Sequence, residues 1–178
     1  DGNFSFFKLL PILIVSLVAT GIFSMLQSAL PLDMVRGGVL RPAFSEALSG
    51  SVITIQLCLL MLFQWPVGSW LAEKKIKFGL VLSIFSLGFG CLLIAFSAMS
   101  RNGLLVIFAS QVFFSLGIAA FLPTATEAVI ALTPIWKRGL ALAFFSQCFA
   151  ITALIAPLIT GFFLDANSNA FLLWFLMA

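Results

Sequence analysis

Few side chains in this 178-residue chain carry chemistry, and several polar ones fall inside long uncharged runs. Among them are the amides Gln27, Gln56, Gln111 and Gln147, and one acid, Glu127, ends such a run but lies inside an expected helix. An amide can bind a polar solute, or it can hydrogen-bond a neighbouring helix. An acid within a membrane is costly to bury and is a functional candidate for that reason.

Other kinds of chemistry are missing from the sequence. It contains no histidine and no tyrosine, so histidine-ligated haem or metal and a histidine proton relay are excluded within this segment. Cys58, Cys91 and Cys148 have no paired spacing and are interpreted as apolar packing residues. No phosphate loop, metal-ligand cluster or nucleophile constellation occurs. We expect no enzyme, no cofactor, no metal site and no nucleic-acid partner.

Composition predicts an integral membrane protein. Hydrophobic residues make up 62% of the chain and charged residues only 8%, against roughly 25% charged in a soluble domain. The charges cluster, and the uncharged stretches between clusters each exceed the ~20 residues that a spanning helix needs. The lipid bilayer is therefore an expected partner. The uncharged stretches are 9–32, 47–72, 78–100, 102–126 and 139–164.

These stretches predict an all-α polytopic bundle over residues 1–178, with five full helices and the start of a sixth. The apolar run that ends the sequence is too short to cross a bilayer, so we expect the chain to stop inside a sixth helix and to be part of a longer protein. The first apolar run is too long for a cleavable signal peptide. Helices are expected near 9–32, 47–72, 78–100, 104–132, 138–164 and, partially, 170–178.

Basic residues are distributed unevenly between the two expected membrane faces. One face holds Lys8, the Lys74–Lys77 loop and the Lys137–Arg138 loop, and the other holds Arg36, Arg41 and Arg101. The positive-inside rule then places the amino end in the cytoplasm. We expect a bacterial inner membrane or a thylakoid membrane. The segment from Asp33 to Ser45 is the longest external loop, and Asp33 with Arg36 is expected to form an exposed i, i+3 pair.

A weak internal repeat supports a three-plus-three inverted arrangement. The sequence from Gly21 to Ala29 matches that from Gly117 to Ala125 at four positions. The ends of the second and fifth expected helices are also alike, with Pro66 and Gly68 in one and Pro157 and Gly161 in the other. Inverted repeats of this kind are common in secondary transporters.

Three segments carry a family resemblance. Pro66–Lys77 resembles the loop between helices two and three of the major facilitator superfamily: a Gly, three residues, an acid, a base, one residue, a Gly and a base. Ser69 stands at the first Gly, Glu73 at the acid and Lys74 at the first base; Ile76 replaces the second Gly, and Lys77 is the last base. Pro134–Ala141, with Arg138 and Gly139, resembles the family's loop between helices four and five. Ala156–Pro157 with Gly161 is similar to a Gly-Pro signature of helix five in some efflux members.

The resemblance implies the amino-terminal half of a secondary transporter that works by alternating access. It also implies that helices one and four line a central cavity. Gln111 stands where many proton-coupled members carry a buried Arg, and a neutral amide cannot shift a carboxylate's proton affinity in the same way. The cavity-lining candidates are Gln27, Gln111, Ser115 and Gln147; for Gln56 and Gln147, hydrogen bonding between helices is the favoured alternative.

A helical wheel separates two faces of the fourth expected helix. Gln111, Ser115, Leu122 and Thr126 share the face expected toward the cavity. The packing face is expected on the other side, with small residues and Glu127, whose carboxylate would pair with Lys137, Arg138 or a backbone amine end. Pro123 is expected to kink this helix. The packing residues are Gly117, Ala120, Thr124 and Glu127.

The resemblance gives Glu73 a role as a cytoplasmic latch. In the family, this acid caps a helix amino end in the carboxy-terminal half and holds one access state, and helix-dipole attraction of that kind contributes ~0.3–2 kcal/mol. The alternative is a solvated charge cluster at the membrane face.

For the whole protein, the expected function is transport of a small solute. The rival is a non-transporting accessory or assembly subunit of a larger membrane complex, such as a photosynthetic one.

The predicted topology can be tested by cysteine labelling. Lys75→Cys and Asn102→Cys lie in loops at opposite ends of the third expected helix. A membrane-impermeant maleimide applied to intact cells is expected to label the Asn102 variant and to spare the Lys75 variant until the membrane is opened. Labelling of both from the same side would contradict the topology.

Overall fold

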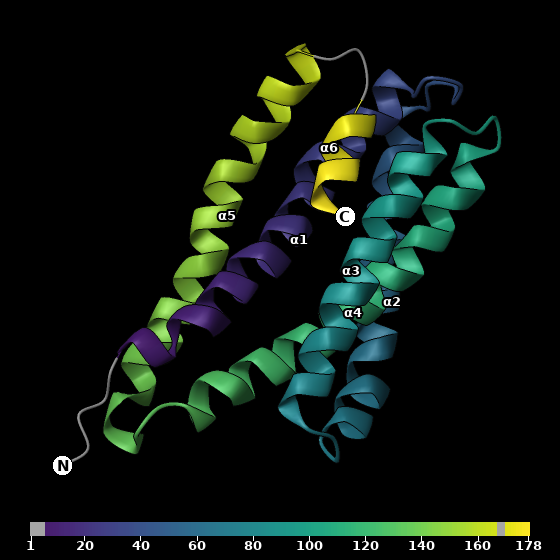
Figure 1. Cartoon of the computed structure of the whole chain (residues 1–178). Helices are drawn as coiled ribbons and strands as arrows, with labels where there is room; N and C mark the ends of the chain where they lie inside the picture. Colours follow the sequence, from purple (N-terminus) through teal and green to yellow (C-terminus); the bar gives the residue numbers. More distant parts are fainter. Residues whose placement is uncertain (1–5, 167–169) are drawn as a thin grey trace.

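The computed structural model describes residues 6–166 and 170–178, and within those ranges its regular elements are all helical. Five of the helices are long and apolar enough to cross a membrane (Figure 1). The expected fold class, an all-α membrane bundle, is confirmed. The helices are α1 (Leu10–Arg36), α2 (Glu46–Leu71), α3 (Ile76–Ser97), α4 (Gly103–Ala131), α5 (Arg138–Ala166) and α6 (Phe171–Met177), with 3₁₀ turns at Phe6–Lys8 and Ile135–Lys137.

Local signals account for several helix ends. Ser45 precedes α2, and its hydroxyl accepts a hydrogen bond from the Leu48 amide at 3.3 Å, while Glu46 places an acid in the positive first turn. Gly37 ends α1 with a φ of 84°, a conformation that glycine adopts without steric cost. α1 therefore extends to Arg36, and the α1–α2 loop begins at Gly37 rather than at Asp33. Pro123 lies inside α4, which bends in its second half toward α5 (Figure 1).

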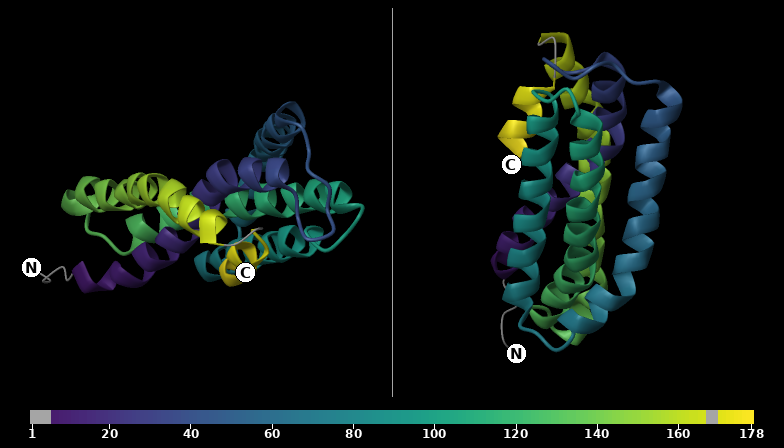
Figure 2. Two further views of the ribbon diagram at one scale, coloured as in Figure 1. Left: turned by 90° about the horizontal axis from the view of Figure 1, so that it is seen from above. Right: turned by 90° about the vertical axis from the view of Figure 1, so that its right-hand side faces the viewer.

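The helices pack in a pattern that repeats within the chain. α1 packs along α5, and α4 packs along α2; α1 also touches α2, as α4 touches α5. If α1, α2 and α3 are exchanged in order with α4, α5 and α6, the α1–α5 contact becomes the α4–α2 contact. The α1–α2 contact likewise becomes the α4–α5 contact. α3 and α6 lie together on one side of the bundle, where α3 also contacts α4 (Figures 1 and 2). Such an exchange is what an inverted repeat of two three-helix units produces.

The closest contact in the bundle joins α3 and α4 through small residues. A Cβ on Gly117 would lie 2.8 Å from Leu87 Cγ and 3.1 Å from the Ser83 carbonyl oxygen. Gly79 faces Thr124 in the same way, and Gly90 faces the Phe114 ring. Small residues let helices in a membrane approach closely, and van der Waals packing then holds them. The small-residue face of α4 thus packs on α3 through Gly117 and Thr124.

Glu127 does not belong to that packing face, contrary to expectation. It is exposed, and the contact stripe continues through buried Ala128 instead. Because a helix has 3.6 residues per turn, the residue that follows Thr124 on the packing face can be three or four positions later. Here it is Ala128, four positions later, so the carboxylate of Glu127 lies outside the interface. The described part of the chain shows no ion pair between Glu127 and Arg138.

The α1–α5 contact is held by polar groups as well as by packing. The Ser24 hydroxyl donates to Thr152 Oγ1 at 3.3 Å, and Ser28 Oγ lies 3.3 Å from Thr160 Oγ1. Thr152 in turn donates to the Cys148 carbonyl at 2.9 Å within α5. Interhelical hydrogen bonds of this type contribute about 0.6 kcal/mol each. These hydrogen bonds therefore fix the register of α1 against α5, although they add little to the free energy of helix association.

We predict that Gly117→Ala destabilises the bundle. The added methyl group would overpack the α3–α4 contact, which typically costs about 1–3 kcal/mol. The matched control is Gly50→Ala on α2, where a Cβ meets nothing within 4 Å and the better helix propensity of alanine acts alone. Unfolding in mixed detergent micelles measures both. Equal stability of the two variants would contradict the close α3–α4 approach.

Candidate functional site

The centre of the bundle is a small apolar cavity where five helices meet. Its volume is about 60 Å³, and α1, α2, α3, α4 and α5 all contribute side chains to it, with Leu87 coming from α3. Phe23 comes from α1, Leu60 from α2, Leu122 from α4 and Phe149 from α5. Gln27 lies one helical turn beyond Phe23 and is exposed, and it is not among the residues that line this cavity. Its expected role in the solute pathway stays a prediction.

Gln111 and Ser115 lie elsewhere than expected. Both are fully buried, and the Ser115 hydroxyl donates to the Gln56 carbonyl oxygen of α2 at 3.0 Å. The Gln111 amide nitrogen donates within its own helix, to Ile107 O at 3.1 Å and Ser110 Oγ at 3.0 Å. In this structure the polar face of α4 therefore packs against α2 instead of lining an open cleft. The sequence predicted a cleft beside this face of α4, but α2 packs there.

Gln56 of α2 lies buried at the contact with α4, without the interhelical hydrogen bond of its side chain that the sequence favoured. Its side chain is fully buried, and neither its amide oxygen nor its amide nitrogen has a hydrogen-bond partner in the described structure. The Gln111 amide oxygen is also without a partner. Buried polar atoms of this kind are uncommon, because each costs free energy. The α2–α4 contact therefore contains polar atoms that another arrangement of the helices could satisfy.

Gln147 is exposed on the side of α5 away from α1.

The outward faces of α2 and α5 share an unusual property. A Cβ added at their glycines would meet nothing within 4 Å, whereas the glycines of α3 and α4 are tightly packed. Glycine in a membrane helix ordinarily marks a close helix contact. These open glycines mark faces to which a further helical layer can pack. They are Gly50 and Gly68 on α2 and Gly139 and Gly161 on α5.

The α2–α3 loop presents its charges to the exterior. Glu73, Lys74, Lys75 and Lys77 are all exposed, and Glu73 makes no ion pair among the described residues. Lys74 Nζ lies 5.8 Å from the centre of the Trp70 ring, a cation–π distance. Ser69 donates to the Pro66 carbonyl of its own helix at 3.0 Å. The Glu73 carboxylate is thus available to a partner.

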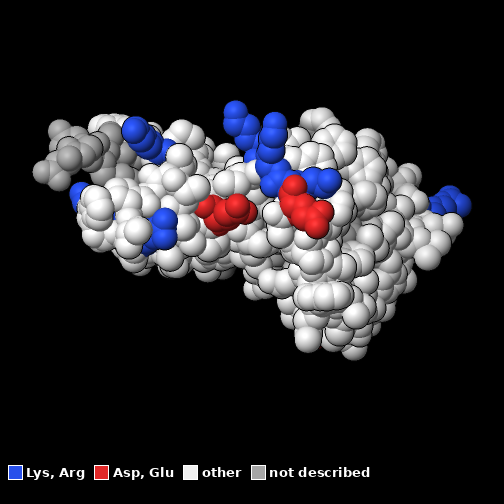
Figure 3. Space-filling view, turned by 90° about the horizontal axis from the view of Figure 1, so that it is seen from below, with Lys and Arg blue, Asp and Glu red and all other residues white. Residues whose placement is uncertain are grey.

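The α4–α5 connection lies at the same end of the bundle. The Arg138 Nε donates to the Thr133 carbonyl oxygen at 3.4 Å across the turn, and exposed Gly139 follows at the start of α5. Seen from this end, basic side chains outnumber acidic ones on the surface (Figure 3). The two short loops and the turn at Phe6–Lys8 therefore form one predominantly basic rim.

The opposite end holds a charged site that the sequence did not reveal. Asp33 and Arg41 are 1% and 3% exposed, and Arg41 Nη2 lies 2.9 Å from Asp33 Oδ1. The same guanidinium donates to the Asp33 carbonyl oxygen at 2.9 Å and to Ser97 Oγ at 2.6 Å. The expected exposed Asp33–Arg36 pair is therefore wrong.

A reversal of the chain after α1 explains this correction. Gly37 turns the backbone, the Gly38 amide donates to the Arg41 carbonyl oxygen at 3.0 Å, and the Leu40 amide donates to Ala98 O at 2.9 Å. The loop thereby lays Arg41 over the end of α1, beside α3. Arg36 instead donates to the Leu164 carbonyl oxygen at 2.6 Å and pairs with Asp165 at 3.4 Å. The spacing of eight residues between Asp33 and Arg41 is no helical signal, which is why it was missed.

Comparison with known proteins fits this geometry. The family model of the Major Facilitator Superfamily matches residues 12–178, which is nearly the whole chain. The chain therefore belongs to the major facilitator superfamily. No curated protein and no solved structure gives a significant match.

We predict that Arg41→Met destabilises the bundle by about 3–5 kcal/mol, because it leaves the Asp33 carboxylate buried without its cation. The matched control is Arg36→Met, whose partner Asp165 is 80% exposed; loss of that pair should cost no more than ~1 kcal/mol. Detergent unfolding of the two variants makes the comparison. Similar small losses in both would contradict a buried charge pair at Asp33.

Proposed function

We propose that this chain is the amino-terminal half of a secondary transporter that moves a small solute by alternating access. The observation that carries the proposal is the repeated packing of α1 on α5 and of α4 on α2 in a chain of this superfamily. In such transporters the solute site lies at the interface between repeats near the middle of the membrane.

The apolar centre around Phe23, Leu60 and Phe149 would form the wall of the solute pathway on this half. Gln27 would supply a donor and an acceptor beside it. Gln111 and Ser115 would contribute when α2 and α4 separate, because the partnerless amide atoms of Gln56 and Gln111 gain hydrogen bonds on exposure. The exposed amide of Gln147 is a further candidate on α5.

The carboxy-terminal half of the protein would cover the open faces of α2 and α5. Gly50, Gly68, Gly139 and Gly161 would then have the close neighbours that they lack in this half alone. The proposed latch is the loop with Ser69, Glu73, Lys74 and Lys77, and its acid would cap a helix amino end across that interface. Arg138 and Gly139 would help to set the angle at which α5 leaves the same rim.

The basic rim is proposed to lie in the cytoplasm, in a bacterial inner membrane or a thylakoid membrane. The rival proposal is an accessory subunit of a larger membrane complex that does not transport. It is favoured by the altered loop, where Ser69 and Ile76 replace glycines, and by Gln111 in place of a basic residue. Glu127, exposed in the second half of α4, is available to the pathway or to a partner subunit in either case.

The latch separates the two proposals. Glu73→Gln keeps the hydrogen-bond acceptor but loses most of the attraction to a helix dipole. A loss of ~1 kcal/mol changes the ratio of access states about fivefold, so solute flux in proteoliposomes of the full-length protein should change without unfolding. Lys75→Gln is the charge control.

Normal flux in Glu73→Gln would refute the latch but would not contradict the proposed transport. No flux from the intact protein across a broad panel of solutes would favour the accessory subunit.

A further inference from the structure

The α2–α4 contact contains buried polar side chains whose hydrogen bonds are incomplete. Ser49, Val52 and Gln56 are buried on one face of α2, at spacings of four or fewer residues. Ser49 Oγ and both amide atoms of Gln56 have no hydrogen-bond partner, and neither does the Gln111 amide oxygen on α4. These side chains are enclosed by helices of this half, so a helix outside it could reach them only if α2 or α4 moved. Their hydrogen bonding is therefore decided within this half.

The counterpart contact in the repeat, between α1 and α5, is better satisfied. The Thr20 hydroxyl of α1 donates to the Cys148 carbonyl oxygen of α5 at 3.5 Å, as the Ser115 hydroxyl of α4 donates to the Gln56 carbonyl oxygen of α2 at 3.0 Å. Hydroxyl pairs between α1 and α5 add to the first bond. In the described part of the chain, the bond from Ser115 is the one side-chain hydrogen bond that joins α2 to α4. It uses the backbone of Gln56, so the whole side-chain amide is left without a partner.

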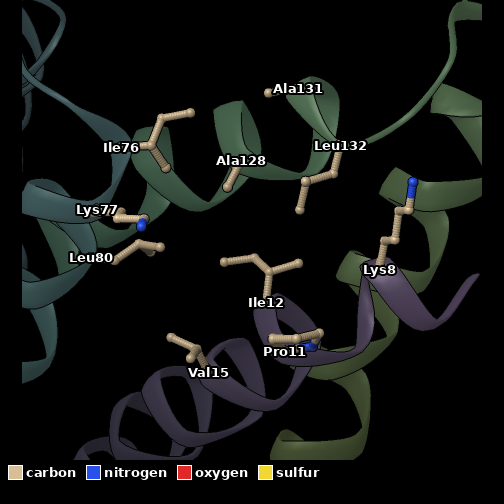
Figure 4. Close-up of a pocket in the computed structure, with 10 residues that line it drawn as sticks. All are labelled: Lys8, Pro11, Ile12, Val15, Ile76, Lys77, Leu80, Ala128, Ala131 and Leu132. Atoms are coloured by element: carbon tan, nitrogen blue, oxygen red, sulfur yellow. The ribbon is translucent and has the colours of Figure 1, made fainter.

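α4 is the fixed member of the α2–α4 contact. The close approach at Gly117 holds it on α3. Near the basic rim, Ala128 of α4 still lines one apolar groove together with Ile76 and Leu80 of α3 (Figure 4). α2 packs chiefly on α4, with a smaller contact on α1. Movement at this contact is therefore movement of α2.

We propose that α2 has a second position on α4, in which the side-chain amides of Gln56 and Gln111 hydrogen-bond to each other. α2 and α4 run in the same direction from the end of the bundle that holds Asp33 and Arg41 (Figure 1). Gln56 now lies level with Ser115, and Gln111 lies one turn, or ~6 Å, nearer that end. A shift of α2 toward that end by part of a turn brings the two amides together. Displacement of one packed element past another, by up to a turn, is an established way to switch between two arrangements.

The shift changes the wall of the central cavity. Leu60 of α2 lines that cavity, and Gln64 follows one turn later on the same helix. As α2 moves, Leu60 withdraws and the amide of Gln64 approaches the cavity. The use of this change rests on the proposed transport, in which a polar wall would form before α2 and α4 separate. The two positions of α2 do not rest on it.

Double electron–electron resonance on the full-length protein tests for the two positions. Spin labels at Ala47→Cys, near the start of α2, and Leu132→Cys, just after α4, stand at opposite ends of the two helices on exposed positions. The shift should lengthen the distance between the labels by about 3–6 Å, and the wild type should show both populations. Both labels belong to this half, so rocking of one half against the other leaves their distance unchanged. The native cysteines Cys58, Cys91 and Cys148 are replaced by alanine in all samples.

Three variants separate the side-chain bond from the backbone bond. Ser115→Ala removes the bond of the present position, so it should raise the ratio of the longer to the shorter population about threefold, the value of one interhelical hydrogen bond. Gln56→Leu keeps the backbone carbonyl but removes the amide, so the longer population should disappear. The matched control is Gln27→Leu, which removes an exposed amide from α1 and should leave the distances unchanged.

A single population in both the wild type and Ser115→Ala would overturn the proposal, because the amides would then be satisfied in place, for example by water. A longer population that persists in Gln56→Leu would also overturn it. So would an equal change in Gln27→Leu, since the effect would not belong to the α2–α4 contact. The measurement needs no solute. Two populations without solute flux would contradict the proposed transport alone, and flux with one population would contradict the second position alone.

Discussion

The close approach of α3 and α4 is the contact on which the rest of this bundle depends. In lipid there is no hydrophobic driving force between helices, so association relies on packing and a few hydrogen bonds. Gly79, Gly90 and Gly117 bring these two helices within van der Waals distance along most of their length. α4 also touches α1, α2 and α5, so the position of α3 fixes the helix that organises the centre. A methyl group at this contact would move every neighbour of α4.

The two ends of the bundle differ in how their charges are used. At one end, Arg41 holds Asp33 inside the protein, and Arg36 ties α1 to α5. At the other end Glu73 and its neighbouring lysines remain exposed. A buried ion pair tolerates little movement, because separating it leaves uncompensated charge, whereas exposed charges can exchange partners at small cost. The first end is therefore built for rigidity and the basic rim for changing contacts.

This contrast suits the latch proposed for the rim. A latch must release and re-form during a cycle. The α2–α4 contact also contains buried polar atoms without hydrogen-bond partners, so the hydrogen-bonding capacity of this interface is not fully used in the present arrangement. The α1–α5 contact, with its hydroxyl pairs, is better satisfied.

The sequence by itself determined the number of spanning helices, the end of the bundle at which each loop lies, and the family. The helix count and the loop ends follow from hydropathy, length and charge spacing, and the family follows from the resemblance of three short segments; all of these signals are local in the sequence. Only the tertiary structure decided how each helix is rotated about its axis, because the faces of such apolar helices differ little in hydropathy. That rotation turned Gln111 and Ser115 against α2 and left Glu127 and Gln27 exposed. The Asp33–Arg41 pair likewise needed the loop reversal at Gly37, a contact between helix ends that no periodicity encodes.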